Sequence, residues 1–155
     1  MKPVIWLRIA SILTLIHSIL HTIGAVFGKP PAGTATMVAA TMRLSFPVFG
    51  VVRSYADFYR GMGLGITILV TMDAVILWLL ASMAKSDAAG IRPILAVFLM
   101  GYLVLALNSY TFILSGPVIN ELLIVVCLGA AIFSAKRTDD HAEPRTRSEL
   151  KTAQL

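Results

Sequence analysis

Four long apolar runs constrain this chain more than any other feature of its sequence. They cover residues 5–27, 58–83, 94–114 and 117–135. Each approaches the roughly 20 residues that a helix needs to cross the hydrocarbon core of a bilayer. Because lipid offers no partner for backbone N–H and C=O groups, each run is expected to be helical. The sequence therefore predicts an all-α fold, an integral membrane four-helix bundle that forms one domain over residues 1–135.

The composition excludes a soluble globular domain. Hydrophobic residues make up 57% of the chain and charged residues only 14%, whereas soluble domains average about 45–50% and about 25%. The formal net charge is +5, but the basic residues lie mostly in the short connections and the C-terminal tail, where they set membrane topology. No nucleic-acid partner is therefore expected. The one cysteine, Cys127, lies in an apolar run, cannot form an intramolecular disulfide and is interpreted as a small buried hydrophobe.

The connections between the runs differ greatly in length. The third and fourth runs are joined by the tight turn 115–117, and the second and third by the short polar stretch 85–93. The segment 28–57 is long and partly apolar, which predicts an interfacial helix or a lid over the mouth of the bundle. Residues 136–155 are polar and lack periodicity, so they are predicted to form a disordered cytoplasmic tail.

The distribution of basic residues predicts the orientation. With both termini inside, the cytoplasmic side holds nine basic residues: Lys2, Arg8, Lys85, Arg92, Lys136, Arg137, Arg145, Arg147 and Lys151. The outer side then holds four: Lys29, Arg43, Arg53 and Arg60. Cytoplasmic loops are enriched in lysine and arginine, so we expect a multi-pass protein of the cell inner membrane with both termini in the cytoplasm.

Small and polar residues follow one stripe of the first helix, in alternating steps of four and three. The stripe consists of Ala10, Thr14, His17, His21, Gly24 and Gly28. Inside a membrane, small and polar faces pack inward and aliphatic faces meet lipid. Both histidines are therefore expected to point into the bundle, and His21 is expected to contact a polar side chain from one of the other helices.

Two G-x-x-x-G pairs predict where the first two helices approach each other. Gly24 and Gly28 lie near the outer end of the first helix, and Gly61 and Gly65 lie near the outer end of the second. Such pairs let helix backbones approach closely. We therefore expect Gly24 and Gly61 at the closest approach of the two helices. The run Gly61–Gly65 is not a phosphate-binding loop, because no strand precedes it.

All four helices place polar residues in the outer half of the bundle. The heptad spacing of Gly101, Asn108 and Ser115 predicts that Asn108 faces inward, and Glu121 is expected to pair with Arg60. Ionisable residues within membrane spans are candidates for a functional site. The ligand-binding residues predicted on this basis are His17, His21, Asp57, Arg60, Asn108 and Glu121. Asp73 lies deeper, and is expected to face either His17 or a second subunit.

Three interpretations of these polar residues stay open at the level of sequence: contacts that only hold the bundle together, a ligand pocket, or a catalytic site. A metal site would need His17 and His21 with Glu121 or Asp57 as a third ligand, and this pattern is too weak to assign a metal. Two histidines one turn apart on one helix cannot hold a haem from opposite faces. The cofactor, if there is one, stays unknown at the level of sequence.

One block of sequence resembles a known family. The block begins at Met42-Arg43 and continues through Phe46 and Gly50 to the run R-S-Y-A-D-F-Y-R-G-M-G-L at residues 53–64. It is similar to the R-S-Y-x-D-F-Y-x-G-x-G-L block of a family of small bacterial four-helix integral membrane proteins, loosely DoxX-like in size and layout. The family often has tryptophan where this chain has Ala56. The pattern His21-Thr22-Ile23-Gly24 and the short turn before the fourth helix are also similar to that family. The resemblance covers most of residues 5–135 and implies a four-helix fold, but it implies no chemistry.

The sequence favours a protein that binds an amphipathic membrane molecule, such as a lipid, isoprenoid or quinone, in a polar pocket in the outer half of the bundle. The alternatives are a membrane acid–base enzyme, such as a lipid double-bond isomerase, and an accessory subunit of a membrane complex with no site of its own. The lipid bilayer is the one partner that follows directly. A homo-oligomer and a larger membrane complex are both compatible with the sequence.

Overall fold

A computed structural model describes residues 2–113 and 115–135 of the chain. Its main elements are four long helices, and all four are long and apolar enough to cross a membrane. The predicted all-α helical bundle is thereby confirmed. The helices are α1 (Pro3–His21), extended by a π-helical turn, η1 (Thr22–Val26), then α3 (Tyr55–Met83), α4 (Arg92–Phe112) and α5 (Ser115–Ser134).

Each helix begins two or three residues before the corresponding apolar run, because polar residues and prolines start the helices. Pro3 and Pro93 lie in the first turns of α1 and α4, where a proline has a suitable φ and no N–H to leave unpaired. Helix α3 begins with a capping box: the Ser54 hydroxyl accepts from the Asp57 backbone N–H, and the Asp57 carboxylate accepts from the Ser54 N–H.

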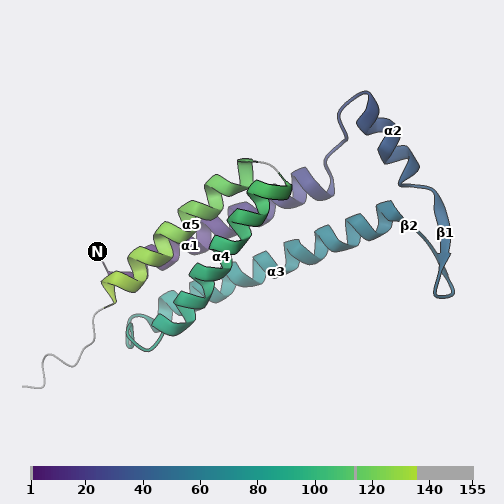
Figure 1. The fold of residues 1–155 in the computed structure, drawn as a ribbon. Coiled ribbons are helices and arrows are strands. Elements are labelled where there is room, and N and C mark those ends of the chain that lie inside the picture. Colours follow the sequence, from purple (N-terminus) through teal and green to yellow (C-terminus); the bar gives the residue numbers. More distant parts are fainter. Residues whose placement is uncertain (1, 114, 136–155) are drawn as a thin grey trace, which may run out of the picture.

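Helix α1 lies at the centre of the bundle. It packs against α3 on one side and α5 on the other, and α4 packs against α5 (Figure 1). Ser11 donates to the Ala74 carbonyl at 2.7 Å and Ser18 donates to the Thr67 carbonyl at 3.1 Å. These hydrogen bonds show that α1 and α3 run antiparallel. Interhelical hydrogen bonds of this kind contribute about 0.6 kcal/mol each on average in a membrane.

The closest approach of α1 and α3 is not at the glycines that the G-x-x-x-G pairs predicted. A side chain added at Gly24 or Gly61 would meet nothing within 4 Å. At Gly63 it would come within 2.9 Å of a methyl group of Val26. The prediction about Gly24 and Gly61 was wrong because α3 is rotated about its axis so that Gly63, the middle glycine of its G-M-G-L-G run, faces α1.

The bundle divides into an apolar half and a polar half. Fully buried leucines fill the half that contains the start of α1 and the α3–α4 connection, among them Leu7, Leu77, Leu95 and Leu128. Toward the α4–α5 turn the buried side chains become polar, and Glu121 and Ser109 lie there. The sequence expected polar groups in this second half, and the structure places them inside it.

The connection between α1 and α3 contains a short helix, α2 (Thr34–Thr41), and a two-stranded antiparallel hairpin, β1 (Ser45–Val48) with β2 (Val51–Ser54). The hairpin was not predicted from sequence. Phe49 and Gly50 form its turn with φ angles of 45° and 84°, and positive φ at both positions is what a tight hairpin turn requires. Figure 1 shows α2 and the hairpin beyond the ends of α1 and α3.

Candidate functional site

A cluster of polar side chains from three helices forms the candidate site. His17 comes from α1, Ser109 from α4, and Asn120 and Glu121 from α5. We call these four residues the His17–Glu121 cluster. Glu121 is 1% exposed and His17 is 10% exposed at the side chain, so both lie inside the bundle as the sequence predicted for His17. The cluster joins the central helix to both helices on one side of it.

Asn120 fixes the orientation of the His17 ring. Its side-chain nitrogen lies 3.1 Å from the Leu13 carbonyl oxygen and 3.3 Å from Nδ1 of His17. Because a carbonyl can only accept, the Asn120 nitrogen that faces it must be the NH₂ group, which then also donates to Nδ1. Nδ1 is therefore the acceptor, and the proton of the neutral imidazole is on Nε2. Nε2 faces Glu121 Oε1 at 3.8 Å.

Glu121 has one oxygen with a partner and one without. Ser109 Oγ donates to Oε1 at 2.8 Å. Oε2 is buried and has no hydrogen-bond partner among the described residues. If the carboxyl group is ionised, Oε2 lacks a donor, and if Oε2 carries the proton, that proton lacks an acceptor. In either state the protein leaves one buried polar atom unsatisfied, which is uncommon in native structures and needs an explanation.

A second polar group lies deeper in the bundle. The Tyr102 hydroxyl is 3.4 Å from Oγ1 of Thr14, which is fully buried, and 3.5 Å from a carboxylate oxygen of Asp73. These are long hydrogen bonds that join α1, α3 and α4. Asp73 therefore contacts α4, which is neither of the two contacts that the sequence analysis expected for it.

His21 contacts α3 and not the His17–Glu121 cluster. Its Nε2 lies 3.2 Å from the Gly63 carbonyl oxygen. The sequence analysis expected a polar side chain as its partner, and the structure shows a backbone group. Nearby hydroxyls pair in the same interface: Ser18 with Thr71 at 2.7 Å and Thr22 with Thr67 at 2.9 Å. This side of α1 is a polar helix–helix seam.

Asp57 and Arg60 lie apart from the cluster, near the start of α3. The Asp57 carboxylate accepts from both the backbone N–H and the hydroxyl of Ser54, so it acts as a helix cap. Arg60 is exposed. The expected pair of Arg60 with Glu121 was wrong: within residues 2–113 and 115–135, Glu121 Oε1 accepts from Ser109 and faces His17.

Asn108 is exposed, so the prediction that it faces inward was wrong. Its neighbour Ser109 takes the inward position and is 1% exposed. Adjacent residues on a helix differ by about 100° in direction, so an error of one residue in the phase of α4 exchanges their roles. The heptad Leu95, Tyr102 and Ser109, all buried, was the pattern that would have identified the correct face.

No group of three or more metal-binding side chains occurs in the part of the chain that the structure describes. Two hollows of the surface, of about 390 and 330 Å³, lie away from the cluster. The first is at the start of α1, and the second adjoins Asp57 and Phe58 on α3. Neither is lined by His17, His21 or Glu121.

A scan against protein-family models, a search of curated proteins and a search of solved structures each found no match to this chain. The chemistry of the cluster is therefore the basis for a functional proposal.

Proposed function

We propose that the protein binds an amphipathic membrane molecule, of the lipid, isoprenoid or quinone class, through the His17–Glu121 cluster. The unsatisfied Glu121 Oε2 is the observation that carries this proposal. A hydroxyl group on the ligand would both donate and accept, so it would satisfy Oε2 in either protonation state of the carboxyl group. Ordinary phospholipid chains offer no such group at this depth.

The depth of the cluster suits a ligand whose chain stays in the bilayer. Glu121 lies six residues after the start of α5, which is about 9 Å along the helix axis. With the predicted topology, this depth is in the outer leaflet. The polar end of the ligand enters beside His17, which keeps 10% side-chain exposure, and the apolar chain remains among the membrane lipids. The surrounding membrane is, in this proposal, the bacterial inner membrane.

Native mass spectrometry of the protein purified in mild detergent tests the proposal. The wild-type protein should retain a co-purifying lipophilic molecule, and Glu121→Leu should lose most of it, because leucine removes both oxygens that a ligand hydroxyl could contact. Asn108→Ala is the matched control, since it removes a polar side chain one residue from Ser109 on the exposed side of α4. Equal retention in the wild type and Glu121→Leu would refute ligand binding at this site.

Acid–base catalysis is the second candidate, and the Asn120–His17–Glu121 arrangement favours it. Asn120 holds His17 with its Nε2 proton directed at Glu121, and an oriented histidine beside a carboxyl group is a common acid–base pair. In a double-bond isomerisation, the Glu121 carboxylate would remove an allylic proton and return it to the far carbon, with no net redox change. If a bound isoprenoid is recovered as two double-bond isomers from the wild type and as one from Glu121→Gln, catalysis is supported.

An accessory role in a larger membrane complex, or a homo-oligomer, is the remaining proposal. The same experiment distinguishes it, because an accessory subunit without a site of its own would carry no lipophilic molecule in the wild type.

A further inference from the structure

A second cluster of polar and charged side chains lies at the opposite end of the bundle, on the face that α1 and α3 share. The guanidinium carbon of Arg8 lies 3.4 Å from the centre of the Trp78 ring. One guanidinium nitrogen of Arg8 also donates to Ser82 Oγ at 3.2 Å. Trp78 and Ser82 are one turn apart on α3, so the two contacts hold the guanidinium group flat against this helix.

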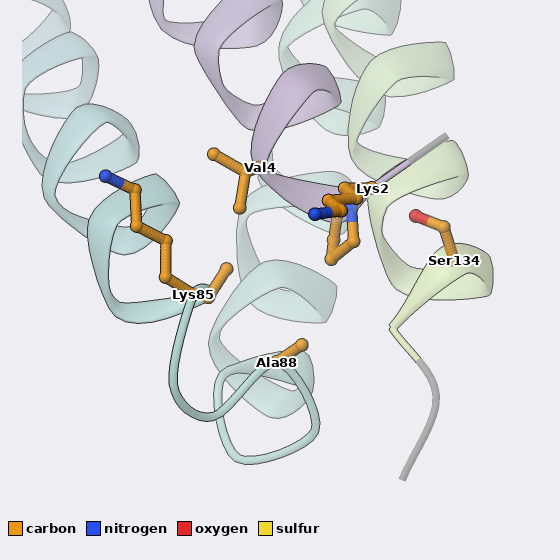
Figure 2. A pocket seen from close by; sticks show the side chains of 7 residues that line it. Lys2, Val4, Lys85, Ala88 and Ser134 are labelled. Carbon is orange, nitrogen blue, oxygen red and sulfur yellow. The ribbon is translucent and has the colours of Figure 1, made fainter. Parts of the chain in front are cut away.

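Lys85 continues the same face of α3. It follows Ser82 by three residues, and its backbone N–H donates to the Ser82 carbonyl at 3.3 Å, so the helical turn carries on past the end of α3. Residues 78, 82 and 85 are therefore neighbours on one surface. In Figure 2 the Lys85 side chain extends from the end of α3 back along that helix, with its nitrogen directed away from Lys2.

A hollow of about 390 Å³ adjoins this face. Its lining includes Lys2 just before α1, Val4 of α1, Lys85 and Ala88 of the α3–α4 connection, and Ser134 of α5 (Figure 2). Its lining includes no acidic side chain. Among the residues that the structure describes, no lysine or arginine forms an ion pair with a carboxylate. Arg8, Lys2 and Lys85 therefore have no carboxylate partner there.

The position of this cluster near one end of the bundle indicates which groups can neutralise its positive charge. α1 begins at Pro3, α3 ends at Met83 and α5 ends at Ser134. These span ends lie where lipid phosphates lie, and long basic side chains reach toward that level. Trp78 also fits this level, since tryptophan is enriched at membrane interfaces.

We propose that Arg8, Lys85 and Lys2 form a binding site for the phosphate of an anionic phospholipid, on the α1–α3 face at the lysine-rich end of the bundle. Trp78 and Ser82 orient the Arg8 guanidinium group, which then presents its other N–H groups to the phosphate oxygens. Lys85 and Lys2 add charge from the rim of the hollow. The acyl chains of the lipid lie along the apolar surface of α1 and α3.

Native mass spectrometry of the delipidated protein, titrated with dioleoylphosphatidylglycerol, measures the binding. The expected result is a saturable one-to-one adduct that dioleoylphosphatidylcholine forms more weakly. Lys85→Gln and Arg8→Gln should each lower the affinity about fivefold, which is the effect expected for one cation near a membrane surface. Arg92→Gln is the matched control, because Arg92 is an exposed cation on α4 at the same end of the bundle. The affinity of this variant for the lipid should differ from that of the wild type by less than twofold.

Two further measurements keep the proposal falsifiable. Lys85 is exposed, so Lys85→Gln tests the site even if Arg8→Gln unfolds. Arg8→Lys should recover only part of the lipid affinity, because an ammonium group lacks the planar set of N–H donors of a guanidinium group. Millimolar inorganic phosphate should not displace the lipid, and displacement would overturn the assignment of a lipid as the source of the phosphate. Equal losses in Arg92→Gln and Lys85→Gln, or unchanged binding in Lys85→Gln and Arg8→Gln, would overturn the site itself.

Discussion

Glu121 connects three helices of the bundle through one side chain. Ser109 donates to its Oε1, His17 faces the same oxygen, and each of these partners comes from a different helix. Glu121 therefore ties α5 to α1 and α4, while its Oε2 stays unsatisfied. An unsatisfied buried polar group costs about 1–3 kcal/mol. The ligand-free protein carries this cost, and a ligand that satisfies Oε2 would remove it.

The Ser109–Glu121 hydrogen bond gives a prediction at the scale of the residue. Ser109→Ala removes the donor at 2.8 Å and leaves the carboxyl group with His17 as its one polar neighbour. The free energy of unfolding should fall by about 1–3 kcal/mol, measured as a lower unfolding temperature in detergent. Asn108→Ala, on the exposed side of the same turn, should stay within about 0.5 kcal/mol of the wild type. If both variants unfold alike, the inward position of Ser109 is wrong.

Helix α1 is the element that organises the bundle, because it has two different polar faces. Ser11, Ser18 and Thr22 contact α3, whereas His17 contacts α5. Small hydroxyl side chains allow close helix packing and still hydrogen-bond across the interface. The seam with α3 is therefore structural, and the opposite face is free to hold the candidate site.

The α1–α3 seam gives a prediction at the scale of the element. Gly63→Leu should lower the free energy of unfolding by about 1–3 kcal/mol, because overpacking forces neighbours from their preferred positions. The added side chain would collide with buried Val26, and it would also disturb the His21 contact with the Gly63 carbonyl. Thermal unfolding in detergent measures the effect.

Gly61→Leu is the matched control for this prediction, since a side chain at Gly61 meets nothing within 4 Å. It should unfold close to the wild-type temperature. A larger loss for Gly61→Leu than for Gly63→Leu would show that the original G-x-x-x-G prediction had the correct phase.

At the scale of the whole molecule, the long helix α3 connects the two ends of the bundle. Its 29 residues span about 43 Å, whereas the hydrocarbon core is about 30 Å thick. α3 is therefore longer than a crossing requires, and its start lies with α2 and the hairpin beyond the α4–α5 turn (Figure 1). The other end of the bundle holds the start of α1, the α3–α4 connection and the end of α5.

The orientation of the molecule is tested with reporter fusions. Basic residues favour the cytoplasmic side, and four spans return the chain to the side where it began. Alkaline phosphatase fused after Leu155 should therefore be inactive, and the same enzyme inserted after Gly50, at the tip of the hairpin, should be active. Immunoblots of both fusions control for expression. The reverse pattern of activity would show that the bundle is inserted the other way round.

Much of the fold could be predicted from the sequence because its signals are local. Apolar runs of membrane length fix the number and the positions of the helices, and the structure differs by two or three residues at each start. The hairpin could not be predicted from sequence alone. The strands Ser45–Val48 and Val51–Ser54 are four residues each and the first contains Pro47, which argues against a strand in sequence. Their turn begins with Phe49, a residue that rarely adopts positive φ.

The candidate site was predictable in part. His17 and Glu121 stand out in the sequence because an ionisable residue within an apolar run is unusual wherever it points. The inward position of Ser109 and the unsatisfied Oε2 depend on the phase of α4 and α5 around their axes. That phase is decided by the packing of all four helices together, since a shift of one residue turns a helix by about 100°. The sequence by itself therefore determined which helices are long and apolar enough to span a membrane and which ionisable residues they carry, and the tertiary structure alone decided which of those residues meet.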